Sequence, residues 1–136
     1  MIYQRLKVPL ICIVIWIAGC VFWNVAGVIL IEKTGTGIGP TASLTVAGIL
    51  MVIAVLLYLA ARFNGLIFSV LSVLCAVAAF AAVYQAFTGD ASLWPTAFWR
   101  WAGAALNLFG FVAGLWGLVC GIRSRRIATD TKIETL

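Results

Sequence analysis

The chain has 136 residues, of which 65% are hydrophobic and 10% are charged. This balance lies far outside that of soluble globular proteins, so we expect a single transmembrane domain over residues 1–136. The net charge of +5 does not favour a nucleic acid partner, because the chain has too few polar residues to present its basic groups on a folded polar surface.

Four apolar runs are long enough to cross a hydrocarbon core of about 30 Å at about 1.5 Å per helical residue. They cover residues 8–31, 42–61, 66–87 and 97–122. None shows the alternating pattern of a membrane β-barrel, so helices remain as the way to satisfy the backbone in lipid. We predict an all-α polytopic membrane protein, an antiparallel four-helix transmembrane bundle.

Basic residues gather on one side of the membrane if the four runs alternate in direction. Only Lys33 and Arg100 then lie on the opposite side. Short loops rich in Lys and Arg stay on the cytoplasmic side. We therefore predict a multi-pass cell-membrane protein with both termini cytoplasmic, and we expect a bacterial inner membrane. The basic residues on the cytoplasmic side would be Arg5, Lys7, Arg62, Arg123, Arg125, Arg126 and Lys132.

Small residues recur at a heptad spacing in the fourth run. A stripe without side chains lets another helix backbone approach closely and gain packing contacts. We predict that this glycine seam packs against a stripe of small residues in the third run, at a crossing angle of about +20°. The glycine seam consists of Gly103, Asn107, Gly110, Gly114, Gly117 and Gly121, and its expected partner of Gly65, Ser69, Ser72, Ala76, Ala79, Val83 and Ala86.

Two connections carry turn signals. Residues 32–41 are rich in glycine, but they lack the preceding strand and the Lys of a phosphate-binding loop. Pro40 with Thr41 or Ser43 is typical of the start and cap of the second helix. Asn64-Gly65 predicts a tight turn that uses left-handed backbone conformations.

The first run contains a sequence that can be interpreted in two ways. Residues 17–20, Ile-Ala-Gly-Cys, are similar to the cleavage site of a bacterial lipoprotein, which would make Cys20 a lipidated N-terminus. A lipidated cysteine normally opens a polar tether, whereas residues 21–31 stay apolar. We favour an uncleaved helix and keep lipidation as the alternative.

The runs lack the side chains that membrane catalysis and ion coupling depend on. The chain has no histidine, and its four carboxylates lie in loops or at the ends of the runs. Proton relays and cation sites in membranes use such groups. The cysteines Cys12, Cys20, Cys75 and Cys120 have no C-x-x-C spacing, so we expect them to act as small apolar residues. We predict no enzyme activity, no metal and no cofactor.

Polar residues concentrate in the half of the predicted bundle farther from the cytoplasm. If they face one another, they form a pocket open to the outside, in which Arg100 would attract a small acid or an anionic headgroup. Asn107 belongs to the glycine seam and Arg100 lies three residues before Gly103 on the same helix face, so these two residues are the strongest pair. Alternatively, the residues make separate interhelical hydrogen bonds, and Trp94, Trp99 and Trp101 form an aromatic belt. The candidate polar cluster is Asn24, Tyr84, Gln85, Arg100 and Asn107, with Thr45 at a similar depth.

These features lead to two functional hypotheses. The first is a non-enzymatic structural or accessory subunit that uses its glycine seam in a homo-oligomer or with a larger membrane protein. The second is a transporter or binding protein for a small anionic solute or a lipid headgroup. Membrane lipid is an expected partner in both.

Overall fold

The structure is a computed structural model, and it describes the backbone of residues 2–134 and the side chains of residues 3–124. Its described part is helical, and four helices are long and apolar enough to cross a membrane, as predicted. The elements are α1 (Ile2–Thr34), α2 (Leu44–Phe63), α3 (Gly65–Thr88), the short 3-10 helix η1 (Ala91–Leu93) and α4 (Ala97–Glu134).

Three helices are longer than the apolar runs that predict them: α3 by one residue at each end, and α1 and α4 by more. α1 starts before Val8 and includes Pro9, and it continues without a break through Cys20. α4 continues beyond Ile122 into the polar residues that follow. An established helix grows at little cost, and the Arg, Lys and Glu residues of this segment are good helix formers, so polarity alone does not end it.

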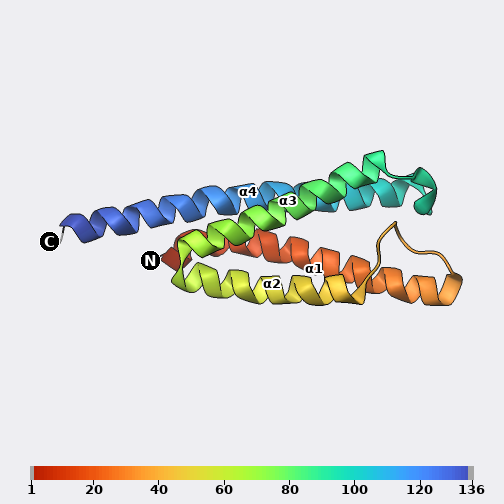
Figure 1. Ribbon diagram of the computed structural model, residues 1–136, viewed down its shortest axis with the longest axis horizontal. Helices are drawn as coiled ribbons and strands as arrows, with labels where there is room; N and C mark the ends of the chain where they lie inside the picture. The colour runs from red at the N-terminus through yellow and green to blue at the C-terminus, as the bar shows by residue number, and fades with distance from the viewer. Residues whose placement is uncertain (1, 135–136) are drawn as a thin grey trace.

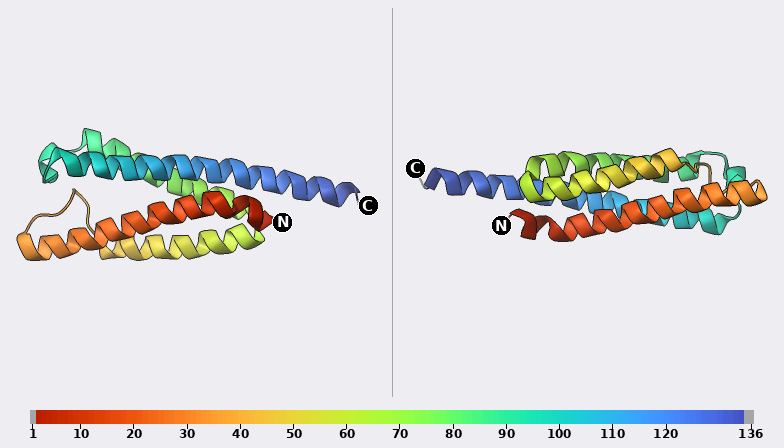
Figure 2. Two further views of the ribbon diagram at one scale, coloured as in Figure 1. Left: turned by 180° about the vertical axis from the view of Figure 1, so that it is seen from behind. Right: turned by 90° about the horizontal axis from the view of Figure 1, so that it is seen from below.

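The helices share two ends, which the connections define. The turn end holds the connection between α2 and α3, and the start of α1 and the end of α4 lie toward it (Figure 1). The loop end holds the α1–α2 connection and the segment with η1. Figure 2 shows the same arrangement from two other sides, with the last part of α4 extending past the other helices.

α3 and α4 make the most extensive helix contact and cross at a shallow angle (Figure 1). A Cβ atom at Gly114 would lie 2.7 Å from the Ser72 carbonyl oxygen, and one at Gly121 would lie 2.7 Å from that of Gly65. Ser69 Oγ donates to the Leu118 carbonyl oxygen across the interface at 3.3 Å. The two backbones are therefore in direct contact.

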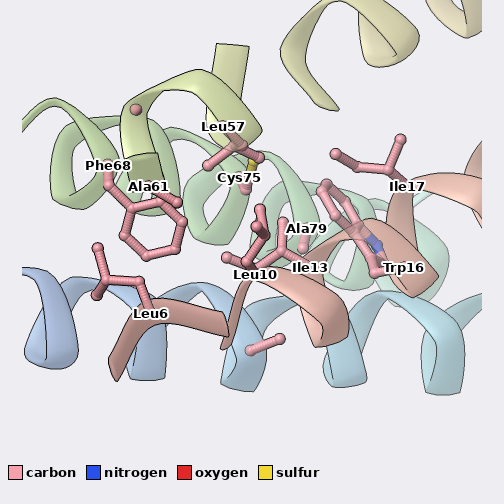
Figure 3. Packing of buried hydrophobic residues seen from close by; sticks show 12 residues of the cluster. Leu6, Leu10, Ile13, Trp16, Ile17, Leu57, Ala61, Phe68, Cys75 and Ala79 are labelled. Carbon is pink, nitrogen blue, oxygen red and sulfur yellow. The ribbon is translucent and has the colours of Figure 1, made fainter. Parts of the chain in front are cut away.

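The apolar core lies between the turn end and the middle of the helices. Figure 3 shows Leu6, Leu10 and Ile13 of α1 beside the side chains of α3, with the Phe68 ring close to Leu6 and Ala61. Phe68 and Leu57 have no exposed surface. This packing joins α1, α2 and α3 near the turn and fixes the point from which the helices continue toward the loop end.

The prediction of a left-handed turn at Asn64-Gly65 is wrong. Asn64 is the single residue between α2 and α3 and is extended, with φ −153°. Its N–H donates to the Ala60 carbonyl oxygen, and its Oδ1 accepts from the N–H groups of Leu66 and Ile67 at 3.0 and 3.2 Å. One side chain thus caps the start of α3 while its backbone closes α2, so no left-handed residue is needed.

Gly65 has a packing role instead of a conformational one. It is the first residue of α3, and a Cβ atom there would lie 3.1 Å from the Gly121 carbonyl oxygen. Glycine permits the close approach of α4 at this point. The described glycine with a positive φ is Gly35, at 76°, just after α1.

The start of α2 agrees with the predicted capping only at Ser43, because α2 begins at Leu44 and Pro40 lies in the α1–α2 connection, four residues before the helix. Ser43 is the N-cap, and its Oγ accepts from Val46 N–H at 3.3 Å. Of the two candidates, the structure selects Ser43 over Thr41. The N–H of Ser43 is also bonded, to the side chain of Asn24 in α1, which fixes the end of the loop against the bundle.

Candidate binding cavity at the loop end

A cavity of about 270 Å³ lies between the helices toward the loop end. All four helices contribute to its wall, as do the α1–α2 connection and the segment before α4. No charged side chain is among the described residues that line it. The lining residues are Trp16, Cys20, Trp23, Asn24, Pro40, Thr41, Val46, Leu50, Ala78, Ala82, Gln85, Ala86, Trp94, Gly103, Leu106 and Asn107.

Three indole rings contribute to the wall. Trp16 and Trp23 lie two turns apart on one face of α1, and Trp94 comes from the connection before α4. Trp94 is held between two glycines: a Cβ atom at Gly39 would lie 2.8 Å from its ring, and one at Gly103 would lie 3.2 Å from it. These glycines create the space that the ring occupies.

Asn107 is a polar residue of the wall that joins α4 to α1. Its Oδ1 accepts from the indole Nε1 of Trp16 at 3.3 Å, and its Nδ2 donates to the Gly103 carbonyl oxygen at 2.9 Å. The thiol of Cys20 is 3.9 Å from the same Oδ1. The amide is therefore satisfied within the protein and orients Trp16, as a buried polar group in an apolar bundle requires.

Asn24 is likewise satisfied within the protein. Its Nδ2 donates to the Cys20 carbonyl oxygen at 2.9 Å, and its Oδ1 accepts from Ser43 N–H at 3.0 Å. The side chain is 9% exposed. Asn24 thus ties α1 to the start of α2 and positions the last residues of the loop over the cavity.

Gln85 is the lining residue whose amide is left for a ligand. It is exposed, and its side chain makes no hydrogen bond to any described residue. A glutamine amide offers two donors and an acceptor. Thr41, also exposed, adds a hydroxyl on the loop side. The polar groups free to meet a bound molecule are therefore neutral and lie at the edge of the cavity.

The predicted polar cluster is only partly brought together. Asn24, Gln85 and Asn107 line the cavity, whereas Tyr84 and Thr45 do not. Tyr84 is 63% exposed and lies on the outer surface of α3. Because Gln85 follows it directly in a helix, the two side chains point about 100° apart and cannot line one cavity equally.

Arg100 lies outside this cavity, and the predicted pair with Asn107 does not form there. The two residues share a helix face but are about 10 Å apart along the axis. The Arg100 guanidinium lies over the Phe87 ring at 5.8 Å from its centroid, and its Nε has no partner among the described residues. Arg100 lines a second, smaller cavity of about 220 Å³ with Trp94 and the neighbouring connection.

The aromatic wall is not predicted from the sequence. Trp16 and Trp23 are seven residues apart, a spacing that indicates one helix face. Trp94 was grouped with Trp99 and Trp101 as an interface aromatic, and nothing in the local sequence distinguishes it. Trp101 is 60% exposed and packs against Phe87, and Trp99 contacts Trp23 from outside the cavity.

The glycine seam has two kinds of neighbour. Gly114, Gly117 and Gly121 face small residues of α3, whereas Gly110 lies against the Trp16 ring and Gly103 against Trp94 and Trp23. The seam is therefore covered inside the chain along its whole length. Over the described residues, no three His, Cys, Asp or Glu side chains are close enough to hold a metal ion.

No protein-family model, curated protein or solved structure matches this chain. Its three indoles, its satisfied asparagines and its exposed glutamine are the features that a ligand would meet.

Proposed function

We propose that this chain is a non-enzymatic multi-pass membrane protein that binds a small, uncharged and mostly apolar molecule in the loop-end cavity. The observation that carries the proposal is a cavity walled by three indoles, with neutral amides and no charged side chain among its described lining. Sites for small molecules commonly combine such apolar walls with a few placed polar groups.

The proposal includes an antiparallel bundle that spans the membrane, with the turn end in the cytoplasm. Arg5, Lys7 and Arg62 belong to the turn end, which fits the retention of basic residues on that side. The outer surfaces of the helices are apolar, with Phe22 73% and Phe63 80% exposed. Lipid would cover these side chains.

The dimensions and chemistry of the cavity limit its ligand. Its 270 Å³ lies just below the range of about 300–1,000 Å³ for small-molecule sites, so the ligand has the size of one or two rings. Indoles favour stacked or edge-on contact with another ring. The amide of Gln85 suits a carbonyl, hydroxyl or amide group on one edge of the ligand.

An anion suits this cavity poorly. Burying a charge without a partner is costly, and Arg100, the cation expected to provide one, lies in the neighbouring cavity. The accessory-subunit hypothesis depended on the glycine seam as a surface for a partner. Because α3 and the tryptophans cover that seam, it does not favour an external partner. Mass analysis of the purified protein distinguishes anion binding and the accessory-subunit role from the proposed function.

The test is mass analysis of the protein purified from its native membrane in a mild detergent. We expect one uncharged small molecule per chain in the wild type. Ala82→Phe places a ring in the wall and should release the molecule. Ala81→Phe, at an exposed position outside the wall, is the matched control and should retain it.

Three results would contradict the proposal. They are the absence of any bound molecule, equal retention by Ala82→Phe and Ala81→Phe, and a bound anion that Arg100→Ala releases. A protein partner that copurifies at a fixed ratio without any small molecule would support the accessory subunit instead.

A further inference from the structure

The loop-end cavity opens sideways, between α2 and α3. Its rim is defined by lining residues that are also exposed, and these include Val46 of α2 and Ala78 and Gln85 of α3. The rim residues on α3 are two turns apart, so the opening runs about 10 Å along that helix. The other described lining residues, Thr41 apart, are buried or half-buried.

The opening follows from the way α2 and α3 leave their turn. Their connection at Asn64 is one residue long, and Leu57 and Phe68 are fully buried near it. Toward the loop end the two helices diverge, because α3 follows α4 upward in the view of Figure 1 while α2 stays beside α1. The exposed lining residues lie on both sides of this divergence, Val46 on α2 and Ala78 and Gln85 on α3.

The α1–α2 connection covers the cavity at the loop end. Ile38 is 6% exposed, Gly39 packs against the Trp94 ring, and Pro40 is part of the wall. Ser43 N–H is bonded to Asn24 at 3.0 Å, which holds the end of this connection down. Packed residues thus cover most of the loop end, where Thr41 is the exposed lining residue, whereas three exposed lining residues border the side opening.

We infer that the cavity exchanges its ligand laterally with the outer leaflet of the membrane. The ligand class is therefore a membrane-dissolved ring compound and not a water-dissolved solute. This inference rests on the proposed membrane insertion and binding function. Leu74 and Val77, 59% and 60% exposed on α3 near the opening, would lie in hydrocarbon, so an apolar molecule can reach the rim without crossing water.

The rim also predicts how the ligand lies. Ala78 is the deeper rim residue, and Gln85 is nearer the loop end. A molecule with one polar edge gains most if that edge meets the Gln85 amide while its rings lie between the indoles. This matches the orientation of an amphiphile in the outer leaflet, whose polar end faces the headgroups, so entry requires no inversion.

The experiment measures whether lipid chains or water-dissolved molecules reach the cavity. Trp99, Trp101 and Trp116, all exposed, are replaced by Phe so that the cavity indoles Trp16, Trp23 and Trp94 remain. The protein is reconstituted in vesicles of phosphatidylcholine brominated at acyl carbons 6 and 7, with unbrominated vesicles as reference. Bromine quenches indole fluorescence on contact, and aqueous acrylamide is the second quencher.

We expect strong quenching by the brominated lipid and weak quenching by acrylamide. Ala78→Phe narrows the opening and should remove most of the lipid quenching. Val77→Phe is the matched control, exposed next to the rim but outside the wall, and should leave quenching unchanged. Circular dichroism checks folding, and Ala78→Leu replaces the larger substitution if Ala78→Phe does not fold.

Two results would overturn lateral entry: stronger quenching by acrylamide than by lipid, or equal lipid quenching in the Ala78 and Val77 variants. The measurement needs no bound ligand. A failure of the proposed binding function would leave the quenching pattern intact, so the two failures can be told apart.

Discussion

The glycine seam of α4 behaves differently at its two ends. Toward the turn end, Gly114 and Gly121 bring the backbones of α3 and α4 into contact. Toward the loop end, Gly103 and Gly110 receive tryptophan rings, from Trp94 and Trp16 respectively. The absence of a side chain therefore lets two helix backbones touch in one region and makes room for a tryptophan ring in the other.

This difference explains where the cavity forms. Helix association in lipid depends on van der Waals packing and interhelical hydrogen bonds, because little hydrophobic force draws helices together. Small residues on both helices let the backbones of α3 and α4 come into direct contact. Where the partner is an indole, the helices stay separated by the ring, and rings do not fill the remaining space. The cavity is the space left between helices that the indole rings hold apart and do not fill.

The largest expected loss of stability comes from adding a side chain where the backbones of α3 and α4 are in direct contact. Gly114→Leu would place a Cβ atom 2.7 Å from the Ser72 carbonyl oxygen and 2.9 Å from Ala76 N, and backbone cannot rotate away. Overpacking typically costs about 1–3 kcal/mol, and a backbone clash belongs at the upper end. Denaturation in mixed micelles, followed by circular dichroism, measures the loss.

Gly48→Leu is the matched control for that substitution. Gly48 lies in the membrane-length helix α2, and a Cβ atom there would meet nothing within 4 Å. Glycine is also a poorer helix former than leucine, so this variant should be as stable as the wild type or slightly more stable. Equal losses at both positions would show that the α3–α4 contact is not the reason for glycine at Gly114.

The helices themselves were predictable from sequence, but their ends were not. Length and apolarity identify four runs because crossing lipid requires both. Hydropathy gives no information on helical residues outside the apolar region, so the start and end of α1 and the end of α4 are not predicted. At Asn64 the sequence predicts a left-handed turn, whereas the backbone is extended and the side chain caps α3. Gly65 is needed for close packing against α4.

A second prediction concerns the hydrogen bonds that close the loop end. Asn24→Leu removes the acceptor for Ser43 N–H and the donor to the Cys20 carbonyl oxygen. Interhelical polar contacts in membranes contribute about 0.6–2 kcal/mol, so stability should fall by roughly this amount. Hydrogen exchange at the Ser43 amide should also become faster.

Tyr84→Leu provides the comparison for Asn24→Leu. Tyr84 was grouped with Asn24 in the candidate polar cluster but lies exposed and outside the cavity. Its substitution should leave stability and Ser43 exchange unchanged. A loss as large as that of Asn24→Leu would mean that Tyr84 belongs to the same network, against the geometry described above.

The cavity was less predictable than the helices because it depends on tertiary geometry. Depth along a helix correctly grouped Asn24, Gln85 and Asn107, since depth follows from sequence position. Depth along a helix does not show that the Arg100 guanidinium lies over the Phe87 ring. It also does not show that the ring of Trp94, a loop residue, contacts Gly39 and Gly103. Such contacts join segments far apart in sequence, and their positions depend on how α2 and α3 diverge.

A third, smaller effect is expected at the turn end. Asn64→Ala removes the oxygen that accepts from the N–H groups of Leu66 and Ile67. Loss of an N-cap costs about 1 kcal/mol, and Asn64→Asp, which keeps the acceptor, should cost little. The denaturation assay used for Gly114→Leu measures both. If Asn64→Ala and Asn64→Asp were equally stable, the capping role of this side chain would be wrong.

The smallest effect should come from the connection that carries Trp94. Asp90 Oδ1 accepts from Ser92 N–H at 2.8 Å, and this hydrogen bond lowers the pKa of the exposed Asp90 carboxyl. Because the folded-state pKa lies below the unfolded value of about 3.9, the bond stabilises the turn fully above that value. The stabilisation is then lost as the pH falls through the folded-state pKa.

The Ser92 amide resonance should therefore shift only in the acid range, with a midpoint below that of an unstructured aspartate. Trp94 follows η1 by one residue, and its N–H donates to the Ala91 carbonyl oxygen, so its indole resonance should shift with the same midpoint. Asp90→Asn keeps an acceptor that does not titrate and should abolish both shifts. If the Trp94 indole of the wild type does not shift with this midpoint, the turn does not position this wall of the cavity, and the packing of the ring between Gly39 and Gly103 is sufficient by itself.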